Sequence, residues 1–186
     1  MSVLSFDEVN KLGGALYERT KDIPKKKRKK KIEDEILELL IMAYIDGYHR
    51  VDPDADIPVK EMYDAVYYLI DGETFADRIS REIDEGTLDR SALERIAETE
   101  YHRVGETGAY NSAQAYEART GLTAYKQWLT MQDNRVRDTH WYLEGTTVLS
   151  NGYFYTFDGE RARFPGGFQK AENNINCRCI ISYSFR

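Results

Sequence analysis

Acidic, basic, imidazole and thiol side chains gather in the last third of this chain. Two groups stand out: Asp133, Arg135, Arg137 and His140, and then Asn176, Cys177, Arg178 and Cys179. Such side chains are costly to bury alone, because each one loses its contacts with water. Their recurrence within one short segment predicts that they satisfy one another or share a site.

The first group has a structural interpretation and a binding interpretation. If a helix begins at Asp133, then Asp133, Arg137 and His140 share one of its faces, and Arg135 points elsewhere. We expect an ion-pair network that fixes the turn between a strand and this helix. The alternative is an anion or nucleotide site built from guanidinium groups. We favour the structural interpretation, because no glycine-rich phosphate loop accompanies these residues.

Cys177 and Cys179 are the only cysteines, and their separation is too short for an unstrained disulfide. On a strand both side chains point to one face, so we expect reduced thiols packed in a core. Zinc binding is an alternative, with His140 as a third ligand, because tetrahedral zinc accepts thiolate and imidazole. His49 and His102 lie on predicted helices without a nearby pair of cysteines. A catalytic cysteine with His140 as its base is weaker still, and we expect no bound metal or other cofactor.

A basic run follows Pro24 and comprises Lys25, Lys26, Lys27, Arg28, Lys29, Lys30 and Lys31. The formal net charge of −6 includes these seven positive charges, so the rest of the chain carries −13. An acidic body argues against a protein that coats DNA. We interpret residues 24–31 as a solvated linker between two helices, and the alternative is a flexible arm that contacts DNA or an acidic partner.

The composition is that of a globular protein, with 41% hydrophobic and 31% charged residues. A length of 186 residues allows one core, or one core with a smaller second one. No apolar stretch is long enough to span a bilayer, and the N-terminus lacks the pattern of a secretory signal, so we expect synthesis and retention in a cytosol. The fourteen tyrosines suit half-buried surfaces and interfaces.

The hydrophobic pattern predicts an α+β fold. A capping box at Ser5 and Glu8 is expected to begin a first helix, which is interrupted at Pro24 and the basic run. Further helices are expected at residues 33–48, 60–70, 74–85 and 91–119. Gly105 and Gly108 lie inside the long last helix and indicate a kink or a tight helix contact. Strands are expected at 123–131, 146–149, 153–157, 161–164 and 179–185, with a two-residue hairpin turn at Asp158-Gly159. The chain thus divides into a helical region, 1–120, and a small, mostly antiparallel β unit, 121–186.

The order of several residues resembles the head-morphogenesis domain of tailed bacteriophages, the family typified by protein F of phage Mu. The residues that carry this resemblance are Trp128, Asp133, Arg135, Arg137, His140, Gly145, Pro165, Asn176, Cys177, Arg178 and Cys179. A helical segment at 95–103 and then Asn111 resemble the lead-in of that domain, although Glu98 stands where the family commonly has arginine. The resemblance covers about half of the chain.

The resemblance implies a minor head protein that acts at the portal vertex during capsid assembly and aids DNA packaging or ejection. Its partners would be the portal protein and the major capsid or scaffold proteins, with at most a weak DNA contact and no membrane. It would reside in the virion head, and in the bacterial host cytoplasm during assembly. The motif residues would hold the β unit in shape, and the role would be association, not catalysis.

Two other functions are alternatives. One is an ADP-ribosyltransferase-like phage effector, because some proteins with this head domain carry toxin domains. Glu98 and Glu100 form a Glu-x-Glu pair of the kind those enzymes use, but they lie within a predicted helix and face different directions. The chain stops at Arg186, seven residues after Cys179, so we expect no appended effector. The other alternative is a DNA-binding accessory protein that uses the basic run.

Overall fold

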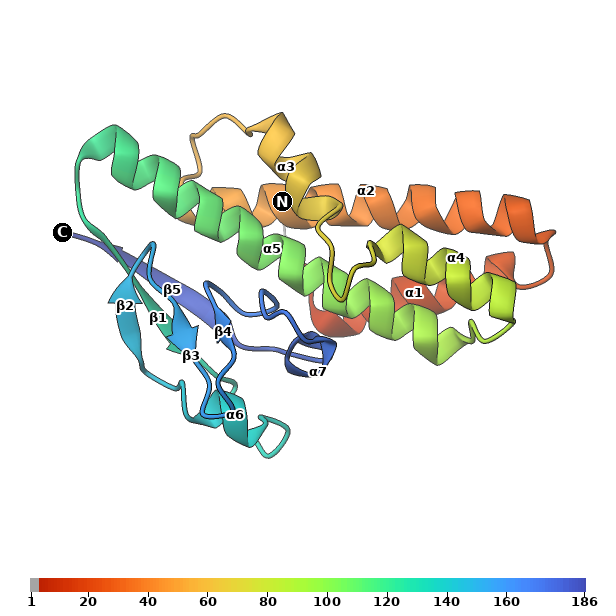
Figure 1. Cartoon of the computed structure of the whole chain (residues 1–186). Coiled ribbons are helices and arrows are strands. Elements are labelled where there is room, and N and C mark those ends of the chain that lie inside the picture. Colours follow the sequence, from red (N-terminus) through yellow and green to blue (C-terminus); the bar gives the residue numbers. More distant parts are fainter. Residues whose placement is uncertain (1–3) are drawn as a thin grey trace.

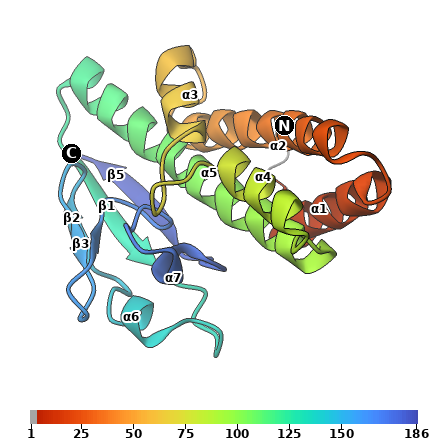
Figure 2. The ribbon, with the colours of Figure 1, turned by 45° about the vertical axis from the view of Figure 1, so that its right-hand side comes forward.

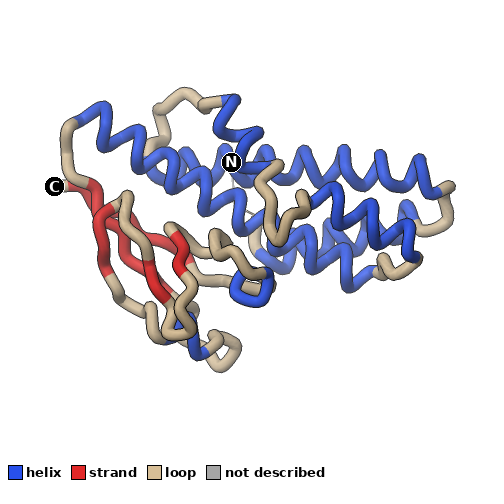
Figure 3. The backbone as a smooth tube through the Cα atoms, viewed as in Figure 1, coloured by secondary structure: helices blue, strands red, loops and turns tan. Residues whose placement is uncertain are grey.

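The computed structural model describes residues 4–186 and has an α+β fold, as the sequence predicts (Figures 1 and 3). Five helices come first: α1 (Phe6–Thr20), α2 (Lys25–Val51), α3 (Val59–Val66), α4 (Phe75–Glu85) and α5 (Arg90–Thr120). The β unit then comprises β1 (Ala124–Leu129), α6 (Asp138–Trp141), β2 (Thr147–Leu149), β3 (Phe154–Tyr155), β4 (Arg161–Ala162), α7 (Ala171–Asn174) and β5 (Ile180–Phe185).

The long helix α5 lies between the other helices and the β unit (Figures 1 and 2). Helices α1, α2 and α4 pack against it on one side, and the β unit covers part of its other side. The middle of α5 is therefore buried around much of its circumference, from Ile96 to Ala113. The main apolar core forms between α5 and its helical neighbours, with Tyr44, Phe75 and Leu93 fully buried.

Glycines allow α2 and α5 to approach backbone to backbone. A Cβ atom at Gly47 would overlap the carbonyl oxygen of Gly105, and one at Gly108 would overlap that of Tyr44. The tight contact predicted at Gly105 and Gly108 is therefore confirmed. Gly105 itself has room for a side chain, since a Cβ there would meet nothing closer than the Ala43 oxygen at 3.5 Å. The close approach depends on the absence of side chains at Gly47 and Gly108.

The β unit contains a three-stranded antiparallel sheet and a hairpin. The sheet order is β2-β1-β5, with Trp128 of β1 opposite Ile181 of β5. Strands β3 and β4 form the hairpin predicted around Asp158-Gly159, although each strand has only two residues. The turn holds three residues, 157–159, and not the two predicted, because the Thr156 N–H donates to the Glu160 oxygen at 2.9 Å and only Gly159 of this loop, at φ +87°, has a positive φ. A second apolar core lies inside the unit around Trp128, Phe154 and Phe168.

The prediction of a linker at residues 24–31 is wrong, because residues 25–31 form the first turns of α2. Lysine and arginine are good helix formers, and nearby acidic groups offset their mutual repulsion. Lys29 pairs with Asp84 of α4 at 2.6 Å, and Lys30 with Asp34 at 3.3 Å. The connection between α1 and α2 is therefore confined to residues 21–24.

Two helix boundaries also differ from the predictions. Helix α5 begins at Arg90, because the Asp89 side chain, and not Ser91, accepts the N–H of Ala92 at 2.7 Å. Helix α3 ends at Val66, four residues earlier than predicted, and Asp71 then takes a positive φ of 52°. The capping box of Ser5 and Glu8 is confirmed at the start of α1. Among the helices of residues 4–186, none combines the length and apolar character needed to cross a bilayer.

Gly47→Ala should destabilise the protein by about 2–3 kcal/mol, because the new methyl group must push α2 away from the Gly105 carbonyl. Gly105→Ala is the matched control on the facing helix. It should be neutral or stabilise by up to about 1 kcal/mol, since alanine favours a helix and has room there. Denaturant unfolding of both variants measures the difference, and equal stabilities would contradict the proposed close approach.

Candidate functional site

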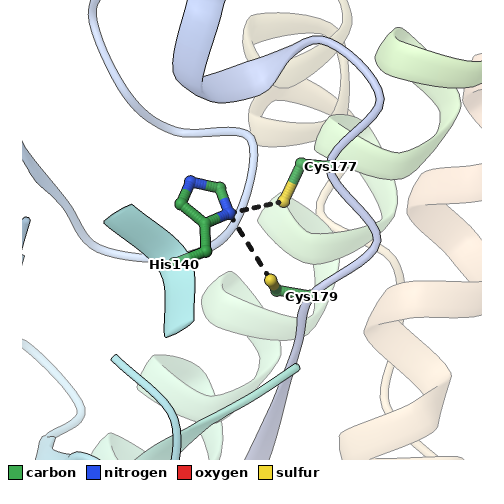
Figure 4. Close-up of side chains that lie close together, drawn as sticks. All are labelled: His140, Cys177 and Cys179. Atoms are coloured by element: carbon green, nitrogen blue, oxygen red, sulfur yellow. Dashed lines mark hydrogen bonds between the residues drawn. The ribbon is translucent and has the colours of Figure 1, made fainter. Parts of the chain in front are cut away.

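His140, Cys177 and Cys179 form a buried cluster inside the β unit (Figure 4). Nδ1 of His140 lies 3.6 Å from Sγ of Cys177 and 3.5 Å from Sγ of Cys179. His140 comes from α6, whereas the two cysteines come from the segment that leads into β5. Each of the three side chains is at most 4% exposed. The structure thus brings together the imidazole and the thiols that the sequence analysis singled out.

Aromatic rings and one turn position this cluster. The His140 ring stacks on Phe168, with centroids 5.4 Å apart, and Trp128 meets it edge-on at 5.5 Å. Asn176 takes φ +56° immediately before Cys177, a conformation that asparagine tolerates better than most residues. This turn directs both thiols inward. The backbone conformation at residue 176 therefore explains why an asparagine precedes the two cysteines.

The two thiols differ in their pKa values. A hydrogen bond with Cys177 lowers the pKa of Cys179 to about 5, and His140 lowers it further against the opposing effect of burial. The same hydrogen bond, together with burial, raises the pKa of Cys177 well above its ordinary value. The hydrogen bond between the two thiols therefore favours ionisation of Cys179 and disfavours ionisation of Cys177.

The expected network of Asp133, Arg137 and His140 on one helix face is wrong. Helix α6 begins only at Asp138, and residues 133–136 form a turn. Asp133 instead accepts two hydrogen bonds from Arg178, at 2.8 and 2.7 Å, and these lower its pKa to about 2. Arg137 donates to the carbonyl oxygen of Ile175. The prediction paired residues that are neighbours on one helix, whereas in the structure these residues pair with partners far away in the sequence.

The remaining motif residues lie at turns or at the surface. Gly145 has φ +72° and donates its N–H to the Trp128 oxygen at 2.9 Å. Pro165 is buried in a loop whose next residue, Gly166, approaches the backbone of α5 at Arg103. The Arg135 side chain is 73% exposed and approaches Asp133 only to 3.8 Å. Arg135, Gly145 and Asn176 are thus the motif residues that the structure leaves exposed.

Residues 61–182 match the family described as Phage Mu protein F like protein. The chain belongs to this family. The matched span begins in α3 and ends in β5, so it includes the long helix and the His140 cluster. No solved structure matches the chain.

Two curated proteins resemble this Mu F-like chain over part of their length. The minor head protein GP7 of Bacillus phage SPP1 is 29% identical over 115 residues, which cover 62% of this chain and 37% of GP7. The NAD(+)–arginine ADP-ribosyltransferase EFV of Enterococcus faecalis is 36% identical over 115 residues, which cover 60% of this chain and 22% of that protein. The chain therefore matches well under half of either relative.

Buried charges on α5 were not identified as a group by the sequence analysis. Glu100 is fully buried between Arg78 and Arg103, and burial raises its pKa less than these two arginines lower it. The pair of Glu98 and Glu100 is therefore not an open acidic site. Glu106 pairs with Arg50 at 2.7 Å and accepts the N–H of Ile181 at 3.2 Å. The glutamate spacing along α5 gave no indication of these partners.

A cleft of about 540 Å³ lies between the helices and the β unit, and the sequence did not predict it. Arginine and tyrosine dominate its lining, and Arg163 lies 4.7 Å from the centre of the Tyr153 ring. Beside it Lys126 is fully buried, donates to the Gly152 oxygen at 2.8 Å and lies 5.0 Å from the Tyr110 ring centre. Burial, assisted by Arg163, lowers the pKa of Lys126 to about 7.

Lys126→Met should remove a specific pH dependence of stability. Between about pH 7 and pH 10.5 the unfolded chain keeps a proton on Lys126 that the folded chain releases. The unfolding free energy of the wild type should therefore rise with pH across this window, by at most about 1.4 kcal/mol per pH unit, relative to the variant. Denaturant unfolding at several pH values tests this. A wild-type-minus-variant difference that stays constant across the window would show that Lys126 remains charged in the folded protein.

Proposed function

We propose that this chain acts as a minor head protein, associating with the portal protein at the portal vertex while a phage head assembles. The observation that carries the proposal is the family match over residues 61–182, together with the likeness to a protein named as a minor head protein. Portal and capsid or scaffold proteins are the proposed partners, the virion head is the proposed final location, and assembly takes place in the host cytoplasm.

The distribution of buried and exposed groups supports a role in association. Arg135 and Asn176 are exposed, but the other polar motif residues bond to one another or to the backbone inside the β unit, so we assign these to holding its shape. Binding is then left to other surfaces. The end of α3 and the residues after it expose Tyr63, Tyr67, Tyr68 and Leu69 around a shallow hollow. Exposed aromatic and aliphatic groups of this kind are typical of protein interfaces.

Capture by purified portal protein from the same phage tests the proposal. The wild-type chain should bind, and Tyr63→Ser combined with Leu69→Ser should weaken binding at least about tenfold, because these residues are 44% and 54% exposed beside the hollow. Phe157→Ser is the matched control, since Phe157 is 63% exposed on the β unit.

Two binding results would contradict the proposal. If the wild-type chain fails to bind portal protein, the proposed association is wrong. If Phe157→Ser weakens binding as much as the double variant does, the assignment of the binding surface is wrong. Quantitative mass spectrometry of purified heads adds an independent measure. A minor head protein should be present in far fewer copies than the major capsid protein, and its complete absence from assembling heads would exclude the role.

DNA contact through the basic turns of α2 is a second candidate function. Lys26, Lys27 and Lys31 are exposed and have no ion-pair partner within residues 4–186. Lys27 and Lys31 lie one turn apart on the same face of α2, and Lys26 lies on the adjoining face. Replacing all three by glutamine should weaken binding to duplex DNA and lower the salt dependence of the binding constant by roughly two to three in slope, as lost phosphate contacts require. An unchanged slope would exclude contact through these lysines.

We propose association without enzymatic turnover, although one relative is named as an ADP-ribosyltransferase. The glutamate pair that suggested this activity includes Glu100, which is enclosed by Arg78 and Arg103 and is inaccessible to a nucleotide. Incubation of the chain with labelled NAD and host proteins should therefore give no labelled product. Transfer of the label would overturn this part of the proposal.

A further inference from the structure

The contacts of the His140 ring are unusual for a hydrogen-bonded core. Nδ1 of His140 has a single hydrogen-bonding position, yet two sulfur atoms lie at nearly the same distance from it, 3.5 and 3.6 Å (Figure 4). At most one of these contacts is a well-directed hydrogen bond. A cation between the three atoms would interact with all of them at once.

The distances agree with the geometry of tetrahedral zinc. With Zn–S bonds of about 2.3 Å and a Zn–N bond of about 2.05 Å, a tetrahedral angle separates sulfur from nitrogen by roughly 3.6 Å. The observed separations of 3.6 and 3.5 Å match this value. The three ligand atoms all lie within 4.8 Å of one another. The three ligand atoms are thus already gathered around one point.

The space and the ligand types also fit. The hollow that His140, Cys177 and Cys179 line has a volume of about 10 Å³, close to that of a single water-sized sphere. Thiolate and imidazole ligands select zinc over magnesium or calcium, which prefer oxygen. Two thiolates neutralise the ion, so the guanidinium of Arg137, which lines the same hollow, is not repelled.

We infer that His140, Cys177 and Cys179 bind one zinc ion, with water at the fourth position. On binding, each sulfur supplies an electron pair to a Zn–S bond, and any proton still held by the thiols passes to solvent, with no change of oxidation state. The ion joins α6 to the start of β5. Because the β unit has about sixty residues and short strands, a metal would add the stability that its small core lacks.

Metal analysis of the purified full-length chain tests this inference. After incubation with zinc sulfate and gel filtration, the wild type should retain about one zinc ion per chain. Cys177→Ser, Cys179→Ser and His140→Gln should each lose this stoichiometric zinc. His49→Gln is the matched control, because its ring lies 3.1 Å from the Ala55 carbonyl, apart from the cluster, and it should retain zinc as the wild type does.

Cobalt substitution of the wild type provides a measurement that does not depend on variants that fold. Bound Co²⁺ should give the charge-transfer absorption of cobalt–thiolate bonds and the intense visible bands of tetrahedral coordination. A chelator should lower the melting temperature of the wild type, and added zinc should restore it. The inference fails if the wild type retains much less than one zinc, if cobalt binds without thiolate absorption, or if folded cluster variants keep as much zinc as His49→Gln.

Discussion

A single buried carboxylate, that of Glu106, connects the helical layer to the β unit. One of its oxygens accepts from Arg50 of α2, and the other accepts the backbone N–H of Ile181 in β5. Burial raises the pKa of Glu106, so its charge depends on Arg50 for compensation. Removing Arg50 would leave the buried Glu106 carboxylate without a compensating charge, and removing Glu106 would leave the buried Ile181 N–H without its acceptor. Both changes are costly in a folded protein. The relative placement of α2, α5 and β5 is constrained through this one side chain.

The glycines of α2 and α5 impose a second constraint on the same region. Because Gly47 and Gly108 bring the two backbones together, Arg50 starts one turn from the contact and reaches Glu106 directly. A wider spacing of the helices would lengthen this ion pair. Gly166 also brings the loop of the β unit close to Arg103, whose guanidinium holds Glu100, since a Cβ at Gly166 would lie 3.0 Å from the Arg103 Cα. Close backbone packing and buried charge pairing therefore support each other along α5.

Features that depend on neighbouring residues could be predicted from the sequence. The capping box at Ser5 and the strand predicted at residues 123–131 follow from local geometry and are confirmed, the strand over Ala124–Leu129. Cys177 and Cys179 both face His140, but they precede strand β5 and do not lie on a strand as predicted. The partner of Asp133 could not be predicted in this way. It is Arg178, forty-five positions away, and only the pairing of β1 with β5 brings their segments together.

The basic run shows a different limit of sequence analysis. A cluster of lysines suggests a solvated linker when it is considered alone, but Asp84 of α4 becomes its neighbour only after the helices pack. The burial of Lys126 has the same origin, since its alternation on β1 shows which face it occupies but not that Tyr110 covers that face. These residues are determined by tertiary contacts that no local pattern encodes.

The continuity of α2 has a mechanical consequence. As a helix of 27 residues it is about 40 Å long, and it extends without interruption from the basic turns to the region beside the C-terminal half of α5 (Figure 1). A helix that packs along its length against a second helix resists bending. A molecule bound at the lysine end of α2 is therefore held at a fixed distance from any partner bound at the opposite end. A force applied at one end is transmitted along the helix to the other.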